Sequence, residues 1–318
     1  MDVSTLKKHG RKFVLVYKDD KKVLDDYIQS LNLFDICIEL GQFSIPAFLQ
    51  NDFIYVFTQM WLPADKQPTE LIQNPRFVFL NVENLTEQNR FQHIVAFIEA
   101  GARIADYSPS NVKLMENYIK ENCQKYKHNI IHMPYQFNLK DFCQIYNTDN
   151  EYEYDVGIIN AYVEPHESVN SVLEYRRNKM WELVQKEEQW KSINIMGWDK
   201  ERDELIKKCK VIINIHHFSC FFIFQHIRCD RMIFANKLIV SDISLYGDTL
   251  DVYDCVTWRL FDDIIQTTKD ILTHFDRMQR RMELLPKKHI CDARHAVLQE
   301  VVDELCKKTD DENVDVEK

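Results

Sequence analysis

Glycine is scarce in this chain, with 6 residues among 318. Neither the G-x-G-x-x-G loop of dinucleotide-binding folds nor the G-x-x-x-x-G-K-[ST] loop of P-loop proteins occurs in the sequence. Both loops need glycine because their backbone turns tightly and approaches a phosphate closely. Their absence counts against an NAD-type dehydrogenase. A phosphate site in this protein would have to use side chains and a helix N-terminus instead.

Long apolar runs and cysteine motifs are missing as well. No window approaches the roughly 18 to 20 apolar residues of a membrane span, and the run 13–17 is too short for a signal peptide. The nine cysteines form no C-x-x-C pair, which is typical of reduced thiols in a cytosol-like compartment. We therefore predict no membrane span and a cytoplasmic location, which for a viral chain means the host cytoplasm.

Positive net charge is the third feature that the chain lacks. The chain has 40 Lys and Arg residues and 50 Asp and Glu residues, so its net charge is −10. This balance argues against broad nucleic-acid binding, and we expect no nucleic-acid partner. With 45% apolar and 28% charged residues, the composition is that of a globular protein, and the length fits two domains.

Strand-like and helix-like segments alternate along the chain, the pattern of doubly wound parallel sheets in an α/β fold. The expected strands are residues 13–17, 36–40, 53–58, 77–82, 103–107, 130–133, 155–161, 192–196, 211–215, 237–241 and 252–257. Helices are expected at 22–31, 86–100, 112–125, 168–185, 200–209, after Ser219 up to Ile233, and at 261–275, 278–285 and 289–308, with a loop at 61–75.

A polar segment that contains NTDNEYEYD divides this series into two similar halves. We expect an amino-terminal domain at 1–140, a linker at 141–154 and a second domain at 155–285. A carboxy-terminal helix at 286–308 and a disordered acidic tail at 309–318 should follow, because the tail lacks an apolar face.

The stretch 210–242 is the most informative part of the second half. A β-rich run, 211–215, precedes two histidines and Ser219, and a helix and another strand follow. In parallel sheets, ligands bind outside the carboxyl ends of the strands. His216, His217 and Ser219 are therefore expected at that edge, beside a helix N-terminus that favours an anion such as phosphate.

This stretch resembles the donor-side signature of the GT-B class of glycosyltransferases, in which a strand ending Asn-x-His leads to a helix with Glu-x-x-Arg. The chain has Asn214 and His216, then Gln225 and Arg228, and a following strand that ends Ser241-Asp242. Gln225 occupies the position at which the family has a glutamate that binds the ribose hydroxyls. A neutral amide can bond the same hydroxyls, although less strongly than a carboxylate.

The resemblance implies two Rossmann-like doubly wound domains that face each other across a cleft, with carboxy-terminal helices bridging them. It implies transfer of a sugar from a nucleotide sugar, a UDP-sugar ahead of a GDP-sugar, to a glycan or protein acceptor. Neither a metal nor another cofactor is expected. The alternative is an inactive nucleotide-sugar-binding or scaffold protein on the same fold. The expected donor-binding residues are Asn160, Arg176, Arg177, Gly197, Trp198, His216, His217, Ser219, Gln225 and Arg228.

Candidate acceptor-side and catalytic residues follow strands of the first half. Glu83 could act as general base if the reaction inverts the anomeric centre, and burial would suit its carboxylate to that role. The alternative role of Glu83 is an electrostatic interaction with the dipole of the next helix. Asn84 and Tyr107 are candidate acceptor-binding residues, and His216 is a candidate for stabilising the leaving phosphate.

A zinc site is an alternative interpretation, because His216, His217, Cys220, His226 and Cys229 are close in the sequence. Their spacing matches no zinc finger or ribbon. We therefore predict no metal requirement.

Overall fold

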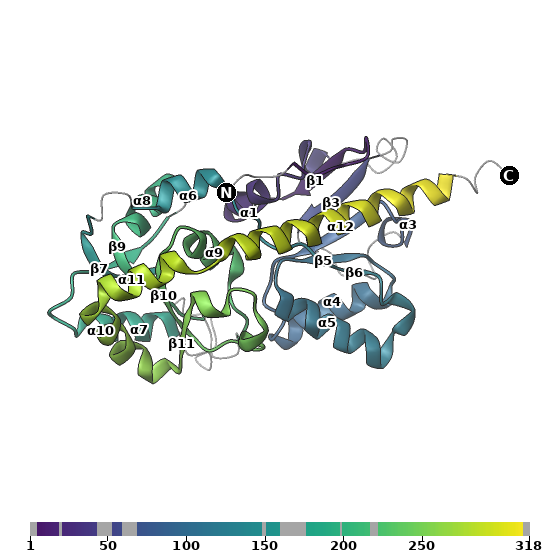
Figure 1. The fold of residues 1–318 in the computed structure, drawn as a ribbon. Helices are drawn as coiled ribbons and strands as arrows, with labels where there is room; N and C mark the ends of the chain where they lie inside the picture. The colour runs from purple at the N-terminus through teal and green to yellow at the C-terminus, as the bar shows by residue number, and fades with distance from the viewer. Residues whose placement is uncertain are drawn as a thin grey trace. The chain divides into compact units, whose positions relative to one another are not determined.

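The computed structural model describes residues 5–18, 21–42, 53–58, 69–147, 151–159, 176–197, 199–216 and 222–313. The chain forms two compact units (Figure 1). The N-unit comprises residues 2–136 and 291–318, and the C-unit comprises residues 137–290. Within the described residues, no helix is long and apolar enough to cross a membrane.

The N-unit contains a six-stranded, fully parallel sheet with the order β2-β1-β3-β4-β5-β6. Its strands are β1 (Phe13–Tyr17), β2 (Ile36–Glu39), β3 (Ile54–Thr58), β4 (Phe77–Asn81), β5 (Ile104–Asp106) and β6 (Ile130–His132). Its helices include α1 (Lys21–Leu31), α3 (Thr69–Ile72), α4 (Gln88–Glu99) and α5 (Pro109–Asn122). The central strands β3 and β4 are buried at every position, as expected for a sheet covered on both faces.

Helices α4 and α5 lie together against one face of this sheet (Figure 1). Phe97 of α4 and Met115 of α5 are buried among the sheet residues Phe77 and Phe79. Ser108 caps α5, because its Oγ accepts a hydrogen bond from the Asn111 backbone N–H. The cap places the polar residues that end β5 directly beside a helix N-terminus.

The C-unit contains a five-stranded parallel sheet with the order β11-β10-β9-β7-β8. Its strands are β7 (Tyr154–Ile159), β8 (Ser192–Ile195), β9 (Cys209–Asn214), β10 (Leu238–Asp242) and β11 (Thr257–Arg259). Its helices include α6 (Leu139–Ile145), α7 (Arg176–Gln185), α8 (Asp199–Lys207), α9 (His226–Phe234), α10 (Ile264–Thr273) and α11 (Phe275–Leu284), and α12 (Lys287–Asn313) starts here.

Both sheets thus share the 2-1-3-4-5 strand order of one group of doubly wound folds, and the N-unit sheet has a sixth strand at its end. In such sheets the ligand crevice lies at the point where the strand order reverses, here between β7 and β9. The predicted α/β fold with two doubly wound parallel sheets is confirmed.

Several predicted boundaries are wrong. Helix α9 begins at His226, so it does not start just after Ser219. The last strand is Thr257–Arg259, because 3₁₀ turns and buried side chains such as Val252 occupy most of the predicted run. Thr86 does not cap α4, whose N-cap is Glu87.

Three further segments differ from their predicted structure. The short helix α3 interrupts the predicted 61–75 loop, and α6 lies within the segment proposed as a linker. Helix α12 continues to Asn313, so residues 309–313 are helical where a disordered tail was predicted. The rest of that tail lies outside the described residues.

Candidate functional site

The carboxyl edge of the C-unit sheet brings together residues that are far apart in the sequence. The register pairs Asn214 of β9 with Ser241 of β10, so the residues after them, up to His216 and Asp242, share one edge. Arg176 and Arg177 open α7 and approach the same edge.

Asp242 is the shared counterion of this edge. Its carboxylate accepts a hydrogen bond of 2.6 Å from Nδ1 of His216 and one of 3.0 Å from Nη2 of Arg176. The backbone N–H of His216 also points at it, at 3.3 Å. Only 2% of the Asp242 side chain is exposed, so one buried carboxylate is the partner of both the Arg176 guanidinium and the His216 ring.

His216 is held from both sides. Its Nε2 lies 3.1 Å from the carbonyl oxygen of Ile223, while Nδ1 faces Asp242. The Asp242 carboxylate can only accept, so Nδ1 is the ring nitrogen that donates to it. With 2% exposure and both nitrogens occupied, His216 is positioned to orient Asp242 and does not offer a free N–H to a ligand. This corrects the prediction that His216 contacts a phosphate directly.

Arg177 joins α7 to the start of α9. Its Nε donates to the carbonyl of Ile215 at 2.8 Å, and its Nη2 donates to Oε1 of Gln225 at 3.1 Å. Burial lowers the pKa of Arg177 well below its usual value, nearby Arg228 lowers it further, and Asp242 opposes both. Arg177 is 7% exposed, so it does not belong to a solvated helix face.

Arg176 and Asn214 each present a buried polar atom to this edge without a partner among the described residues. The Arg176 guanidinium lies 4.6 Å from the ring centre of Phe261, and its Nε is unbonded. Asn214 donates from Nδ2 to Ser241 Oγ at 3.0 Å, whereas its Oδ1 is unbonded. Buried polar atoms are usually satisfied, so these two mark a place where a ligand or water would be stabilised.

These side chains can bind an anion. Arg176 and His216 bond Asp242, Arg177 lies within electrostatic range of both Asp242 and Arg228, and Gln225 is the N-cap residue of α9. The side chain of Gln225 makes no capping bond. The N–H groups of His226 and Arg228 donate to the carbonyls of Phe224 and Gln225, which leaves the Ile227 N–H as the group of the first turn that could meet a ligand. The excess of positive charge and the helix N-terminus both favour a diphosphate.

The remaining donor-side predictions divide into two groups. Gly197 follows β8 at φ +91°, is exposed, and has open space where a Cβ would be. Asn160, Trp198, His217 and Ser219 lie outside the described residues.

In the N-unit, Glu83 pairs with Arg90, and 43% of its side chain is exposed. It is therefore not the buried carboxylate that the general-base prediction envisaged. Asn84 caps a turn by accepting from the backbone N–H and hydroxyl of Thr86. Tyr107 is 7% exposed and packs edge-on against Tyr27, which is a core position.

The buried carboxylate of the N-unit is Asp106, at the end of β5. It accepts hydrogen bonds from Nδ2 of Asn81 at 2.6 Å, from Nδ2 of Asn111 at 2.9 Å and from the Ser108 N–H at 2.7 Å. Burial raises the pKa of Asp106 to about 8, although these three bonds oppose the shift. The β4–β5 register places Asn81 opposite Asp106, a neighbour relation that the motif spacing alone does not reveal.

Among the described residues, no group of three or more His, Cys, Asp or Glu side chains is arranged to hold a metal. His226 instead bonds Asp230 through Nδ1 at 3.0 Å, and burial raises the pKa of the Cys229 thiol. His217 and Cys220, the other residues of the zinc alternative, lie outside the described part of the chain.

Comparisons with known proteins found sequence relatives in Acanthamoeba polyphaga mimivirus, all called uncharacterized proteins. One is 25% identical over 297 residues, which cover 92% of this chain and 86% of the relative. A second is 29% identical over 70% of this chain, and a third is 26% identical over 79%. The chain spans only 23% and 32% of the length of these two relatives. No family model matches.

Among solved structures, a glycosyltransferase from Rickettsia africae is similar over 94% of this chain and 99% of its own. The sequence identity is 11% and the TM-score is 0.48. A TM-score below 0.5 does not establish a shared arrangement of the two chains.

Proposed function

We propose that the protein is a glycosyltransferase that uses a nucleotide-sugar donor. The observation that carries the proposal is the cationic edge of the C-unit, where Arg176 and His216 share Asp242 and Arg177 reaches Gln225 at the N-terminus of α9. A diphosphate at this edge would supply the negative charge that the cluster lacks. The resemblance of the same residues to the GT-B donor signature supports a nucleotide sugar as the ligand.

In the proposed arrangement, the two units form a GT-B cleft, with the donor on the C-unit and the acceptor on the N-unit. Gln225 and Arg228 would bind the ribose and diphosphate, and Arg176 would bind the phosphate nearer the sugar. His216 would hold Asp242 in place. No metal is needed, because basic side chains and the helix dipole neutralise the departing diphosphate.

The proposed reaction breaks the bond between the sugar anomeric carbon and the β-phosphate oxygen and forms a bond to an acceptor hydroxyl. The nucleoside diphosphate leaves with the electron pair of the broken bond. Retention would pass the acceptor proton to that phosphate, whereas inversion would need a base such as Glu83. The pairing of Glu83 with Arg90 favours retention, because an exposed, ion-paired carboxylate is a weak base.

Binding of UDP and GDP to the whole protein, measured by calorimetry, tests the donor site. Arg228→Ala and Arg176→Ala should each weaken binding by roughly tenfold or more, because each removes a charge-assisted contact with phosphate. Lys186→Ala, an exposed change just after α7, is the matched control and should bind normally. If both arginine variants bind UDP and GDP with unchanged affinity, this edge is not the donor site.

A second assay separates a transferase from an inactive nucleotide-sugar binder. Gln225, in place of the family glutamate, favours the binder as the alternative function. Release of UDP or GDP from nucleotide sugars, measured over a panel of donors and with added glycans, should show turnover in the proposed enzyme. Tight binding without turnover across the panel would select the scaffold alternative.

A further inference from the structure

Helix α11 carries an exposed stripe made of Arg277, Arg280, Arg281 and Leu284, here called the arginine stripe. At 3.6 residues per turn, positions 277, 280, 281 and 284 fall within about 100° of one another around the helix. The three arginines are exposed, and 84% of Leu284 is exposed. The apolar side of the same helix includes Met282, which is buried in the C-unit core.

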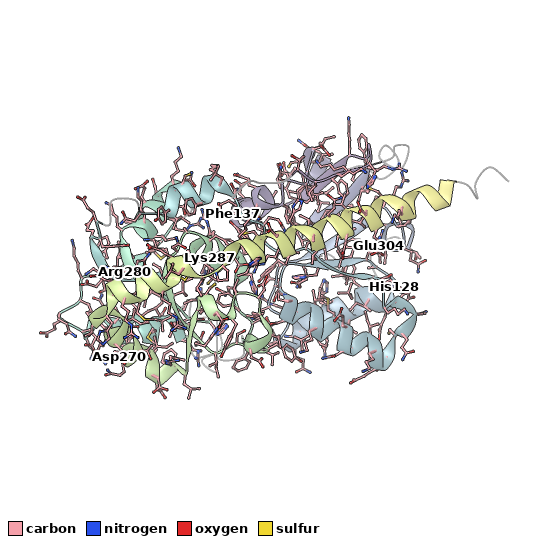
Figure 2. The ribbon with its side chains drawn as sticks, in the orientation of Figure 1. His128, Phe137, Asp270, Arg280, Lys287 and Glu304 are labelled. Carbon is pink, nitrogen blue, oxygen red and sulfur yellow. The ribbon has the colours of Figure 1, made fainter. Side chains whose placement is uncertain are left out.

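The arginines of the stripe are not engaged in the fold. Among the described residues, the structure records no hydrogen bond or ion pair to Arg277, Arg280 or Arg281. The acidic residues of α11, Asp276 and Glu283, lie next to Arg280 on the helix, four residues before it and three after it, and both line the same hollow as Arg280. Figure 2 marks Arg280 among the side chains of this helix.

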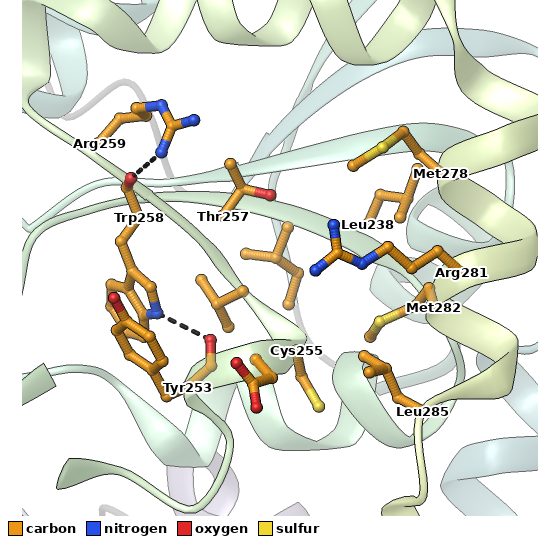
Figure 3. A pocket seen from close by; sticks show the side chains of 13 residues that line it. Leu238, Tyr253, Cys255, Thr257, Trp258, Arg259, Met278, Arg281, Met282 and Leu285 are labelled. Atoms are coloured by element: carbon orange, nitrogen blue, oxygen red, sulfur yellow. Dashed lines mark hydrogen bonds between the residues drawn. The ribbon is translucent and has the colours of Figure 1, made fainter. Parts of the chain in front are cut away.

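Hollow surfaces flank the stripe on both sides of α11. Arg281 extends across a cavity of about 250 Å³ whose floor includes Leu238, Met282 and Leu285 (Figure 3). Arg277 and Arg280 line a wider hollow of about 830 Å³. The three arginine side chains therefore border open hollows on both sides of the helix.

We propose that the arginine stripe docks the protein on an anionic phospholipid surface. The guanidinium groups would bind headgroup phosphates, and Leu284 would enter the boundary between headgroups and acyl chains. Residues 274–289 hold five Lys or Arg against two Asp or Glu, in a chain of net charge −10. An anionic surface would thus attract this segment, while the net charge of the chain opposes other orientations.

A lipid surface fits these features better than a nucleic acid or an acidic protein. A fully exposed leucine between arginines gains nothing from a phosphodiester backbone, but it is stabilised at a membrane interface. Three arginines and one leucine make a weak, reversible and salt-dependent anchor.

Vesicle sedimentation tests the proposal with the whole protein. It should sediment with vesicles of phosphatidylcholine and phosphatidylserine, but not with phosphatidylcholine alone, and added salt should release it. Each arginine contributes roughly fivefold in affinity, so the Arg277→Ala, Arg280→Ala, Arg281→Ala triple variant should lose about a hundredfold. Leu284→Ser should lose several-fold at every salt concentration, because its contribution is apolar.

The matched control is Lys120→Ala, Lys125→Ala, Lys127→Ala, which removes the same charge from exposed positions of the N-unit. It should sediment like the unchanged protein. Failure to bind phosphatidylserine vesicles at low salt would overturn the proposal, as would equal losses in the control and the arginine triple. Leu284→Ser also gives a test against a polyanion as the partner. If this change alters neither vesicle binding nor heparin binding, the leucine has no role, the partner is a polyanion, and the lipid proposal is overturned.

Discussion

At the scale of single residues, Asp106 shows how a strand end can combine burial with polar contacts. Its three donors are themselves fixed. The Asn81 and Asn111 side-chain oxygens accept from the backbone N–H groups of Glu83 and Leu85, so their amides must turn their donors toward Asp106. The carboxylate therefore organises the loop after β4 and the start of α5.

Asp106 should make stability depend on pH. Its folded pKa of about 8 exceeds the unfolded value of about 4, so its favourable contribution is complete below pH 4 and is lost as pH rises through 8. Between these two pH values, the free energy of unfolding of the native protein should fall relative to that of Asp106→Asn by up to about 1.4 kcal/mol per pH unit. Urea unfolding followed by circular dichroism at several pH values measures this.

Asp35→Asn is the control for this measurement. The pKa of Asp35 is lowered despite the opposing effect of burial, because hydrogen bonds from the Phe13 N–H and from Lys8 outweigh it. The contribution of Asp35 to stability is present above pH 4 and is lost only as pH falls below that value. The decrease in stability between pH 5 and 8 should therefore persist in Asp35→Asn. If the pH dependence of stability is the same in Asp106→Asn as in the native protein, Asp106 is not its source.

At the scale of elements, the contact between α7 and α9 leaves Arg177 as a buried cation bonded to a neutral amide. Gln225→Glu should stabilise the protein by about 1 kcal/mol, because it gives Arg177 a carboxylate partner and adds a negative charge at the N-terminus of α9. Gln225→Ala should destabilise it by a similar amount. Urea unfolding compares the two, and an unstable Glu variant would show that the site already holds enough negative charge.

The elements also show which parts of the fold the sequence predicts. The parallel strands were recognised because a strand buried on both faces is a continuous β-rich run, as in β1 and β9. The start of α9 was misplaced because the apolar residues before it suit a helix, whereas Phe224 is buried in non-helical backbone. The sequence predicts that His216 lies at the carboxyl edge of the sheet, but the pairing of His216 with Asp242 depends on strand register, which one sequence does not specify.

At the scale of the whole molecule, α12 completes the core of the N-unit. Leu298 and Val302 are fully buried, and Gln299 exchanges hydrogen bonds with the backbone of Lys7. Leu298→Ala should lower the stability of the N-unit by about 2–5 kcal/mol, because a large cavity would remain. Hydrogen exchange should show faster opening of β1–β6 and unchanged protection of β7–β11.

Ile271→Ala in α10, at a buried position of the C-unit, is the matched control and should have the reverse pattern. Equal loosening of both sheets by either change would mean that the two units unfold as one cooperative body. In that case the division into units would describe contacts but not stability.

The membership of α12 in the N-unit has a consequence for synthesis on the ribosome. Residues 137–290 emerge before Leu298 and Val302, so the C-unit has its whole sequence available while the first-made unit still lacks a helix. Although domains often fold in the order of translation, here the earlier segment must wait for the last one. A nascent chain stalled before residue 291 would expose the apolar surface that α12 later covers and would be a natural client for chaperones.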